Sequence, residues 1–290
     1  MERKPVSVPE SGLFLKFLYN TVLGRVVLKG LSSRRLSVYC GKLLDAPVSR
    51  LLIPGFIKKN NICMDEYVKK DFTSFNDCFT RQILPENRII NRNKEVLISP
   101  CDGLLSVYNI SKDTVFPIKQ SRYTVLDLLQ DTELSEQFYD GVCMVFRLCV
   151  NHYHRYCYID SGFKGDNHFI SGKLHTVRPI ALRRFPVFTE NCREYTLLKT
   201  ENFGSVVQLE VGAMLVGKIK NYHGAGAVKR GDEKGLFCYG GSTIVVLLQK
   251  DAVKLPEYIF EATKAGKEIE VRMGEQIGIS EKAAFSRQGI

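Results

Sequence analysis

The chain has 290 residues, of which 44% are hydrophobic and 25% are charged, enough apolar material for one large globular domain or two small ones. Its 41 Lys and Arg residues outnumber its 31 Asp and Glu residues, and the formal net charge of +10 suits a nucleic acid or an anionic membrane face. No low-complexity tract or internal repeat is present, which excludes repeat architectures.

Residues 11–60 mix apolar and basic side chains. Apolar residues from Leu13 to Val26 fall close to helical spacing, and Lys16 and Lys29 lie mostly off that face. No uncharged run approaches the roughly 20 residues that span a bilayer. The pattern is typical of a helix in a membrane interface or of a helix packed on the protein's own core, and this segment alone leaves both open.

The next elements change character along the chain. Residues 64–90 predict a helix, with Phe72, Phe75 and Phe79 at helical spacing and Pro85 at its end. After residue 97, short β-branched and aromatic runs alternate with turns, apart from a short helical insertion at residues 119–138. We therefore predict an α+β fold, in which a helical region (residues 1–96) lies on a predominantly antiparallel β body (residues 97–290).

Common cofactor and nucleophile motifs are absent from the sequence. There is no GxGxxG, GxxxxGK[ST], HExxH or GxSxG, and the nine cysteines form no CxxC pair, so no metal site is predicted. The odd cysteine count and the lack of a secretion signal predict reduced thiols in a cytosolic compartment. The basic residues are dispersed and Trp is absent, which argues against nucleic-acid binding.

Two short segments set polar residues against apolar runs. SPCDG places Asp102 in an Asp-Gly pair before a predicted strand, where a plain turn is the commoner explanation. NHYHRYC contains His152 and His154, which would share one face if the segment were a strand. Single histidines are more often structural than catalytic, so this pair leaves both interpretations open.

A third segment, GGST, puts Ser242 directly after two glycines and before an apolar, β-branched run. Glycine reaches backbone conformations that are closed to other residues, so the Ser242 Oγ could approach the carbonyl carbon of Gly241. That approach permits an N-to-O acyl shift that gives an ester, if a base takes the hydroxyl proton and donors stabilise the oxyanion. On its own, the segment is only a turn.

When these three segments are taken together, the chain resembles phosphatidylserine decarboxylases, the pyruvoyl-dependent enzymes that make phosphatidylethanolamine. The resemblance covers the chain from about residue 70 to its end and is weaker in the first sixty residues. It rests on seven blocks in the family's order: SFNDCFTRQILPENR, SPCDG, HYHRYCYIDSG, GKLHTVRP, FTENCREYTLL, VGAMLVGKI and KRGDEKGLFCYGGST.

The resemblance implies a self-cleaving carboxy-lyase. Ser242 would attack Gly241, with Asp102 and a histidine as charge relay, and cleavage would leave a large chain (residues 1–241) and a small chain (residues 242–290) as a heterodimer. Residue 242 would become a covalent pyruvoyl group. Its ketone would form a Schiff base with the amine of phosphatidylserine and draw electrons from the carbon that loses CO2.

The YHR block departs from the family pattern at one position. Many members carry two histidines in YHRxH, whereas here His154 matches the first and Cys157 occupies the second. We therefore predict His154 as the relay histidine and keep His152 as a reserve. Cys157 is left as either an acid or a core residue.

The resemblance also favours the membrane interpretation of residues 11–60. It implies a peripheral enzyme on the cytoplasmic face of the cell membrane, bound to an anionic surface, with phosphatidylserine as substrate and no nucleic-acid partner. A homo-oligomer is left open. The alternatives are a pyruvoyl decarboxylase for another serine-headed lipid or an amino acid, and a lipid-binding relative that never matures.

Overall fold

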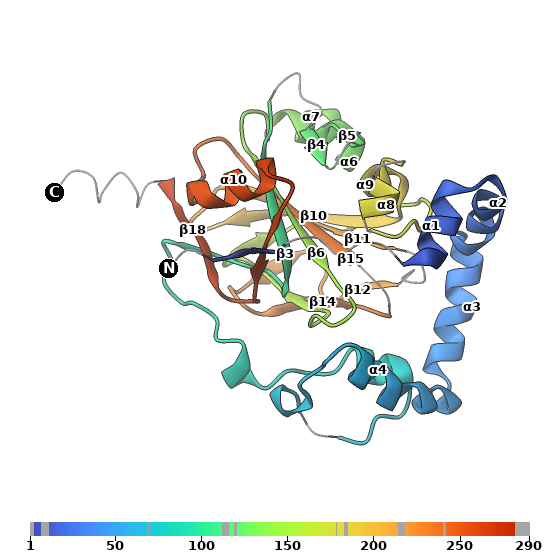
Figure 1. Cartoon of the computed structure of the whole chain (residues 1–290). Helices are drawn as coiled ribbons and strands as arrows, with labels where there is room; N and C mark the ends of the chain where they lie inside the picture. Colours follow the sequence, from blue (N-terminus) through green and yellow to red (C-terminus); the bar gives the residue numbers. More distant parts are fainter. Residues whose placement is uncertain are drawn as a thin grey trace.

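The computed structural model describes residues 3–6, 12–68, 70–111, 116–118, 121–177, 179–182, 185–213, 218–239 and 242–281. It confirms the α+β class, because helices flank a large antiparallel sheet (Figure 1). None of the described helices is long and apolar enough to cross a bilayer.

Short helices dominate the first part of the chain. Side-chain hydroxyls of Thr21 and Ser33 accept hydrogen bonds from backbone N–H groups in the first turns of the second and third helices and so fix where they begin. The elements are α1 (Leu13–Asn20), α2 (Val22–Leu31), α3 (Arg34–Asp45), η1 (Pro47–Leu52), α4 (Ile53–Lys59), η2 (Met64–Glu66), α5 (Phe75–Phe79) and η3 (Pro85–Asn87).

The helix predicted over residues 64–90 is wrong: among the described residues of that range, only those of α5 are α-helical. The backbone folds back on itself instead, since Tyr67 and Ile83 form a β-bridge and the Val68 N–H donates to the Gln82 carbonyl. A continuous helix would hold these residues far apart. Of the three phenylalanines at helical spacing, Phe75 and Phe79 lie in α5 and Phe72 precedes it.

The main sheet has ten strands, and the described strand pairs are antiparallel. In spatial order they are β1 (Pro5–Val6), β17 (Glu268–Val271), β3 (Gly103–Asn109), β6 (Val142–Leu148), β15 (Ser242–Leu248), β11 (Ser205–Val211), β10 (Arg193–Thr200), β8 (Gly162–Lys164) and β13 (Gly226–Val228), with β9 (His168–Ile170) also paired to β10.

Smaller elements cover both faces of this sheet. One small sheet contains β12 (Ile219–Asn221), β14 (Glu233–Phe237) and β7 (Arg155–Cys157); a second contains β16 (Val253–Lys254), β18 (Gln276–Ser280) and β2 (Val96–Ile98); a third contains β4 (Phe116–Ile118) and β5 (Ser121–Tyr123). The remaining helices are α6 (Val125–Leu129), α7 (Thr132–Glu136), α8 (Pro179–Leu182), α9 (Val187–Glu190) and α10 (Glu257–Lys264). The helical insertion predicted at residues 119–138 is confirmed by α6 and α7, although residues 119–120 lie outside the described residues.

The central strand β15 shows how the core is divided. Its residues alternate between two hydrophobic clusters: Val245 and Leu247 pack with helices such as α6, whereas Ile244 and Val246 pack with α10, β7 and β14. Ser242 is two residues before Ile244 in the strand, so its side chain lies on the same face of the sheet as Ile244 and Val246. Leu18 of α1 belongs to the first cluster. The division of the chain into two regions at residue 96 stays a prediction.

Candidate functional site

One end of the main sheet gathers the three segments that the sequence singled out. Asp102 directly precedes β3, Ser242 begins β15, and Ser242 lies opposite Leu148, the last residue of β6. Because β6 lies between β3 and β15 and neighbouring strands are separated by about 4.8 Å, the backbones at the starts of β3 and β15 lie roughly 10 Å apart. The two histidines follow β6 at this same end.

Ser242 is fully buried, at 0% exposure. Its Oγ has no hydrogen-bond partner among the described residues. Such a group is rare in native structures and costs free energy, so it calls for a functional explanation. The hydroxyl fits the predicted nucleophile and precursor of a pyruvoyl group; Gly241 lies outside the described residues.

Asp102 is held by a buried arginine. Arg88 Nε donates to Asp102 Oδ1 at 2.8 Å and Nη2 donates to Oδ2 at 2.6 Å, and the Met273 N–H donates to Oδ1 at 2.9 Å. Burial lowers the pKa of Arg88, but the hydrogen bonds and charge of Asp102 raise it further, so the guanidinium stays charged. Among the described residues, no histidine hydrogen-bonds to Asp102.

His152 lies in a turn and His154 directly precedes β7, so the segment is not the strand in which the two rings would share one face. β6 ends at Leu148 and β7 begins at Arg155. Between them, the His152 N–H donates to the Cys149 carbonyl at 2.9 Å, and the Cys149 N–H donates to His152 Nδ1 at 3.1 Å. These local bonds close a turn, so the face-sharing expected of a strand does not apply.

The hydrogen bonds assign different tautomers to the neutral rings. His154 Nδ1 lies 2.9 Å from the His152 carbonyl oxygen, and because a carbonyl only accepts, Nδ1 carries the proton and Nε2 is the basic nitrogen. His152 Nδ1 accepts from Cys149, so its Nε2 carries the proton. His154 therefore presents a base at Nε2 and His152 presents a donor.

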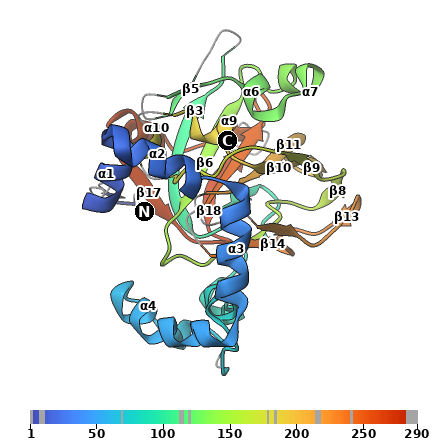
Figure 2. The same cartoon turned by 90° about the vertical axis from the view of Figure 1, so that its right-hand side faces the viewer.

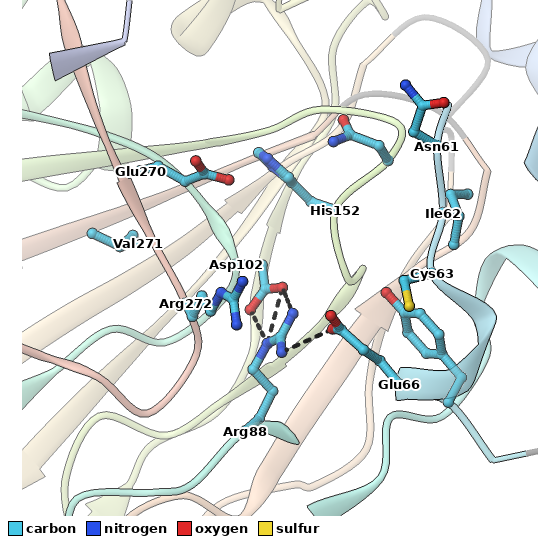
Figure 3. Close-up of a pocket in the computed structure, with 12 residues that line it drawn as sticks. Asn61, Ile62, Cys63, Glu66, Arg88, Asp102, His152, Glu270, Val271 and Arg272 are labelled. Atoms are coloured by element: carbon cyan, nitrogen blue, oxygen red, sulfur yellow. Dashed lines mark hydrogen bonds and ion pairs between the residues drawn. The ribbon is translucent and has the colours of Figure 1, made fainter. Parts of the chain in front are cut away.

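The predicted site residues lie in two neighbouring places: Asp102 and His152 line a cavity, and His154 lies among aromatic residues. Asp102 and His152 line one polar cavity of about 200 Å³, together with Glu66, Arg88 and Glu270 (Figure 3).

His154 packs on aromatic residues beside the segment that leads to Ser242. Its ring lies 4.2 Å from the ring of Phe79, centroid to centroid, and Phe79 lies 5.2 Å from Tyr239. Tyr239 is three residues before Ser242. The structure thus places His154 next to the approach to Ser242.

Cys157 is a buried residue of β7 within the second hydrophobic cluster. Burial raises the pKa of its thiol to about 12. The thiol is therefore protonated at neutral pH and cannot act as a base there.

Two further charged residues, Arg88 and Glu210, lie in this region, and neither was assigned a role from the sequence. Arg88 lies within a quoted block, but its contact with Asp102 depends on the fold. Glu210 of β11 lies opposite Ile244, on the Ser242 face; Lys234 Nζ donates to its Oε2 at 2.6 Å, and its Oε1 has no partner among the described residues. Burial raises the pKa of Glu210. A lone carboxylate in the apolar run SVVQLEV is a signal that could have been noticed.

Burial lowers the pKa of His152, although the charges of Asp102 and Glu270 oppose this. The unfolded chain therefore binds this proton more tightly, and the free energy of unfolding should fall as the pH drops below about 6.5. Urea unfolding at pH 7.5 and 5.5 tests this, with His152→Gln expected to show a weaker pH dependence. Identical pH dependence in both proteins would contradict the assignment.

Comparison with known proteins identifies the family of the chain. The sequence profile of the family described as phosphatidylserine decarboxylase matches residues 75–279. Phosphatidylserine decarboxylase proenzyme 2 of Clostridium acetobutylicum is 50% identical over 265 residues, which are 91% of each chain. Phosphatidylserine decarboxylase proenzymes of Clostridium botulinum (strain Alaska E43) and Ruminiclostridium cellulolyticum are 41% and 39% identical, over 91% and 92% of this chain and 92% and 91% of theirs. The chain therefore belongs to the phosphatidylserine decarboxylase family.

Proposed function

We propose that the chain is a proenzyme that cleaves itself between Gly241 and Ser242 and then converts phosphatidylserine to phosphatidylethanolamine and CO2. The observation that carries this proposal is the buried Ser242 hydroxyl, which has no partner among the described residues and begins a central strand. Family membership supplies the reaction class.

In the proposed cleavage, His154 Nε2 takes the proton from Ser242 Oγ, and Oγ attacks the carbonyl carbon of Gly241. The amide C–N bond breaks as the ester C–O bond forms, with the proton passing to the nitrogen of residue 242. β-Elimination then releases the Gly241 carboxylate, and hydrolysis converts residue 242 to a pyruvoyl group with release of ammonia. That group supplies an electron sink for the departing CO2.

Asp102 acts in this proposal through its position and charge. Arg88 and the Met273 N–H fix both of its oxygens, so a negative charge is kept at the end of the sheet where the histidine becomes protonated. His152 lines the same cavity as Asp102 and presents Nε2–H as a donor. We keep His154 as the base because its Nε2 is the nitrogen that can accept a proton.

The two chains are expected to stay together after cleavage. β15, which would belong to the small chain, is hydrogen-bonded between β6 and β11 of the large chain. β17 and β18 are likewise paired with β3 and β2. Separation would expose buried apolar strands such as β15 to water, so we propose a tight non-covalent heterodimer.

We further propose that α1–α3 dock on the cytoplasmic face of an anionic membrane. Leu18, Tyr19 and Leu28 are buried in the main core, so part of this region does pack on the protein itself. The opposite side remains apolar and exposed, as Leu13 at 86% and Val22 at 72% exposure illustrate. Exposed apolar side chains of this kind beside basic ones suit helices that bind a membrane surface.

Replacement of exposed residues tests the membrane proposal more cleanly than deletion, which would also remove Leu18 and Tyr19 from the core. Leu13→Ser, Phe14→Ser, Leu23→Ser and Val26→Ser together should weaken binding to phosphatidylserine vesicles by about tenfold or more. Self-cleavage should be unchanged. Sedimentation with vesicles measures the first and gel electrophoresis the second; equal loss of both would contradict the proposal.

A denaturing intact-mass spectrum of the purified protein tests self-cleavage. We expect two chains divided between residues 241 and 242, the small one carrying the mass of a pyruvoyl end. One uncut chain after long incubation would favour the lipid-binding relative that never matures. Decarboxylation assays with phosphatidylserine, free serine and other amino acids distinguish a lipid decarboxylase from an amino-acid decarboxylase.

A further inference from the structure

A second cavity, of about 340 Å³, lies between α3, α5 and the residues just before the cleavage segment. Val38 and Lys42 of α3 line one side, and Asn76, Lys218 and Tyr239 line the other. Its volume is at the lower end of the range for small-molecule sites, about 300–1,000 Å³. It is distinct from the cavity that holds Asp102 (Figure 3).

The charges of this cavity favour an anion. Lys42 and Lys218 supply two ammonium groups, and Asp45 is the one carboxylate in the lining. The Asp45 carboxylate already accepts a hydrogen bond from Asn76 Nδ2 at 2.8 Å. Burial raises the pKa of the Cys238 thiol, although Lys218 opposes this, so Cys238 adds no negative charge at neutral pH. The lining is therefore net positive.

Ser37 gives an independent sign of a ligand. It lines this cavity, is only 2% exposed, and its Oγ has no hydrogen-bond partner among the described residues. A buried hydroxyl without a partner costs free energy. An acceptor oxygen in the cavity would satisfy it.

The cavity adjoins the candidate catalytic residues. The Tyr239 N–H donates to Asn76 Oδ1 at 3.2 Å, which fixes the cavity wall to the chain three residues before Ser242. An extended chain of that length reaches at most about 10 Å. Phe79 contacts both Tyr239 and His154, so the same wall is also close to the proposed base.

We propose that this cavity binds the phosphodiester of the lipid substrate, with Lys42 and Lys218 as counter-ions and Ser37 as a hydroxyl donor. The inference rests on the proposed function, because the amine that must reach residue 242 lies only a few bonds from that phosphodiester. Val38 and Leu43, about half exposed on α3, offer an apolar path for the acyl chains. Figure 2 shows α3 passing in front of the sheet between α2 and α4, so these residues lie on one of the helices proposed to dock on the membrane.

The test is the double variant Lys42→Gln/Lys218→Gln, assayed with dihexanoyl phosphatidylserine below its micelle concentration. Loss of two charge-assisted contacts should raise KM by about tenfold or more, while kcat and self-cleavage change little. The control Lys58→Gln/Lys59→Gln removes the same charge from exposed positions at the end of α4 and should change KM by less than about twofold. Lys42→Arg/Lys218→Arg should stay close to the original KM.

Two further measurements separate the outcomes. Calorimetry with glycerophosphoserine reports on the site without catalysis. If glycerophosphoserine binds and the Lys→Gln pair abolishes this binding, the site is supported even in a protein that never decarboxylates lipid. Absence of lipid decarboxylation would refute the proposed function alone. Binding to phosphatidylglycerol vesicles reports on surface attraction. If the Lys→Gln pair weakens only vesicle binding and leaves KM for the short-chain substrate unchanged, the lysines serve the membrane surface and the inference fails. An unchanged KM together with unchanged glycerophosphoserine binding would also overturn it.

Discussion

Ser242→Ala should leave the chain intact, with self-cleavage slowed by several orders of magnitude. The change removes both the attacking oxygen and the group that must leave in the β-elimination, so neither the ester nor the pyruvoyl group can form. Stability should change little, because the hydroxyl that is removed has no partner among the described residues. Intact-mass measurement over days reports cleavage, and thermal unfolding confirms the fold.

Thr243 provides the matched control for this experiment. Its Oγ1 is also buried without a partner among the described residues, but it lies on the opposite face of β15. Thr243→Val should therefore still cleave between residues 241 and 242. Cleavage of Ser242→Ala before residue 243 would show that Thr243 can act as nucleophile, and cleavage before residue 242 would rule out the proposed chemistry.

The sequence was sufficient for the fold class and for singling out the segments of the candidate site, because both depend on local patterns. Alternation after residue 97 predicts the strands, and Asp102, His154 and Ser242 each lie in a short block. Antiparallel pairing of β3, β6 and β15 then brings the ends of these blocks together. The error over residues 64–90 arose because phenylalanine spacing cannot reveal the bridge between Tyr67 and Ile83.

The partners of the site residues could not be predicted in the same way. The Arg88–Asp102 pair depends on how the segment before β2 crosses the end of the sheet. The tautomers of the two histidines depend on backbone groups in the segment between β6 and β7. Contacts of this kind follow from tertiary structure, and no periodicity in the sequence encodes them.

Arg88→Met should have the largest effect among substitutions outside the reacting groups. It leaves the Asp102 carboxylate buried, with a side chain only 7% exposed, and without its hydrogen bonds from Arg88. Loss of one partner from such a pair costs about 3–5 kcal/mol in the free energy of unfolding. The carboxylate also loses its fixed position, so self-cleavage of the folded fraction should slow. Urea unfolding and time-resolved intact-mass spectra measure the two effects.

Arg230→Met is the control that separates stability from function. Arg230 Nη2 lies 2.8 Å from Asp160 Oδ1, and the two side chains are 6% and 1% exposed, so its burial matches that of Arg88. Its loss should destabilise the protein by a similar amount yet leave the cleavage rate of the folded fraction unchanged. Arg88→Lys keeps the positive charge but not the bidentate geometry. Compared with Arg88→Met, it should restore the free energy of unfolding more fully than the cleavage rate. If both Met variants cleave at the same rate, the fixed position of Asp102 has no part in the reaction, and Arg88 is only a structural residue.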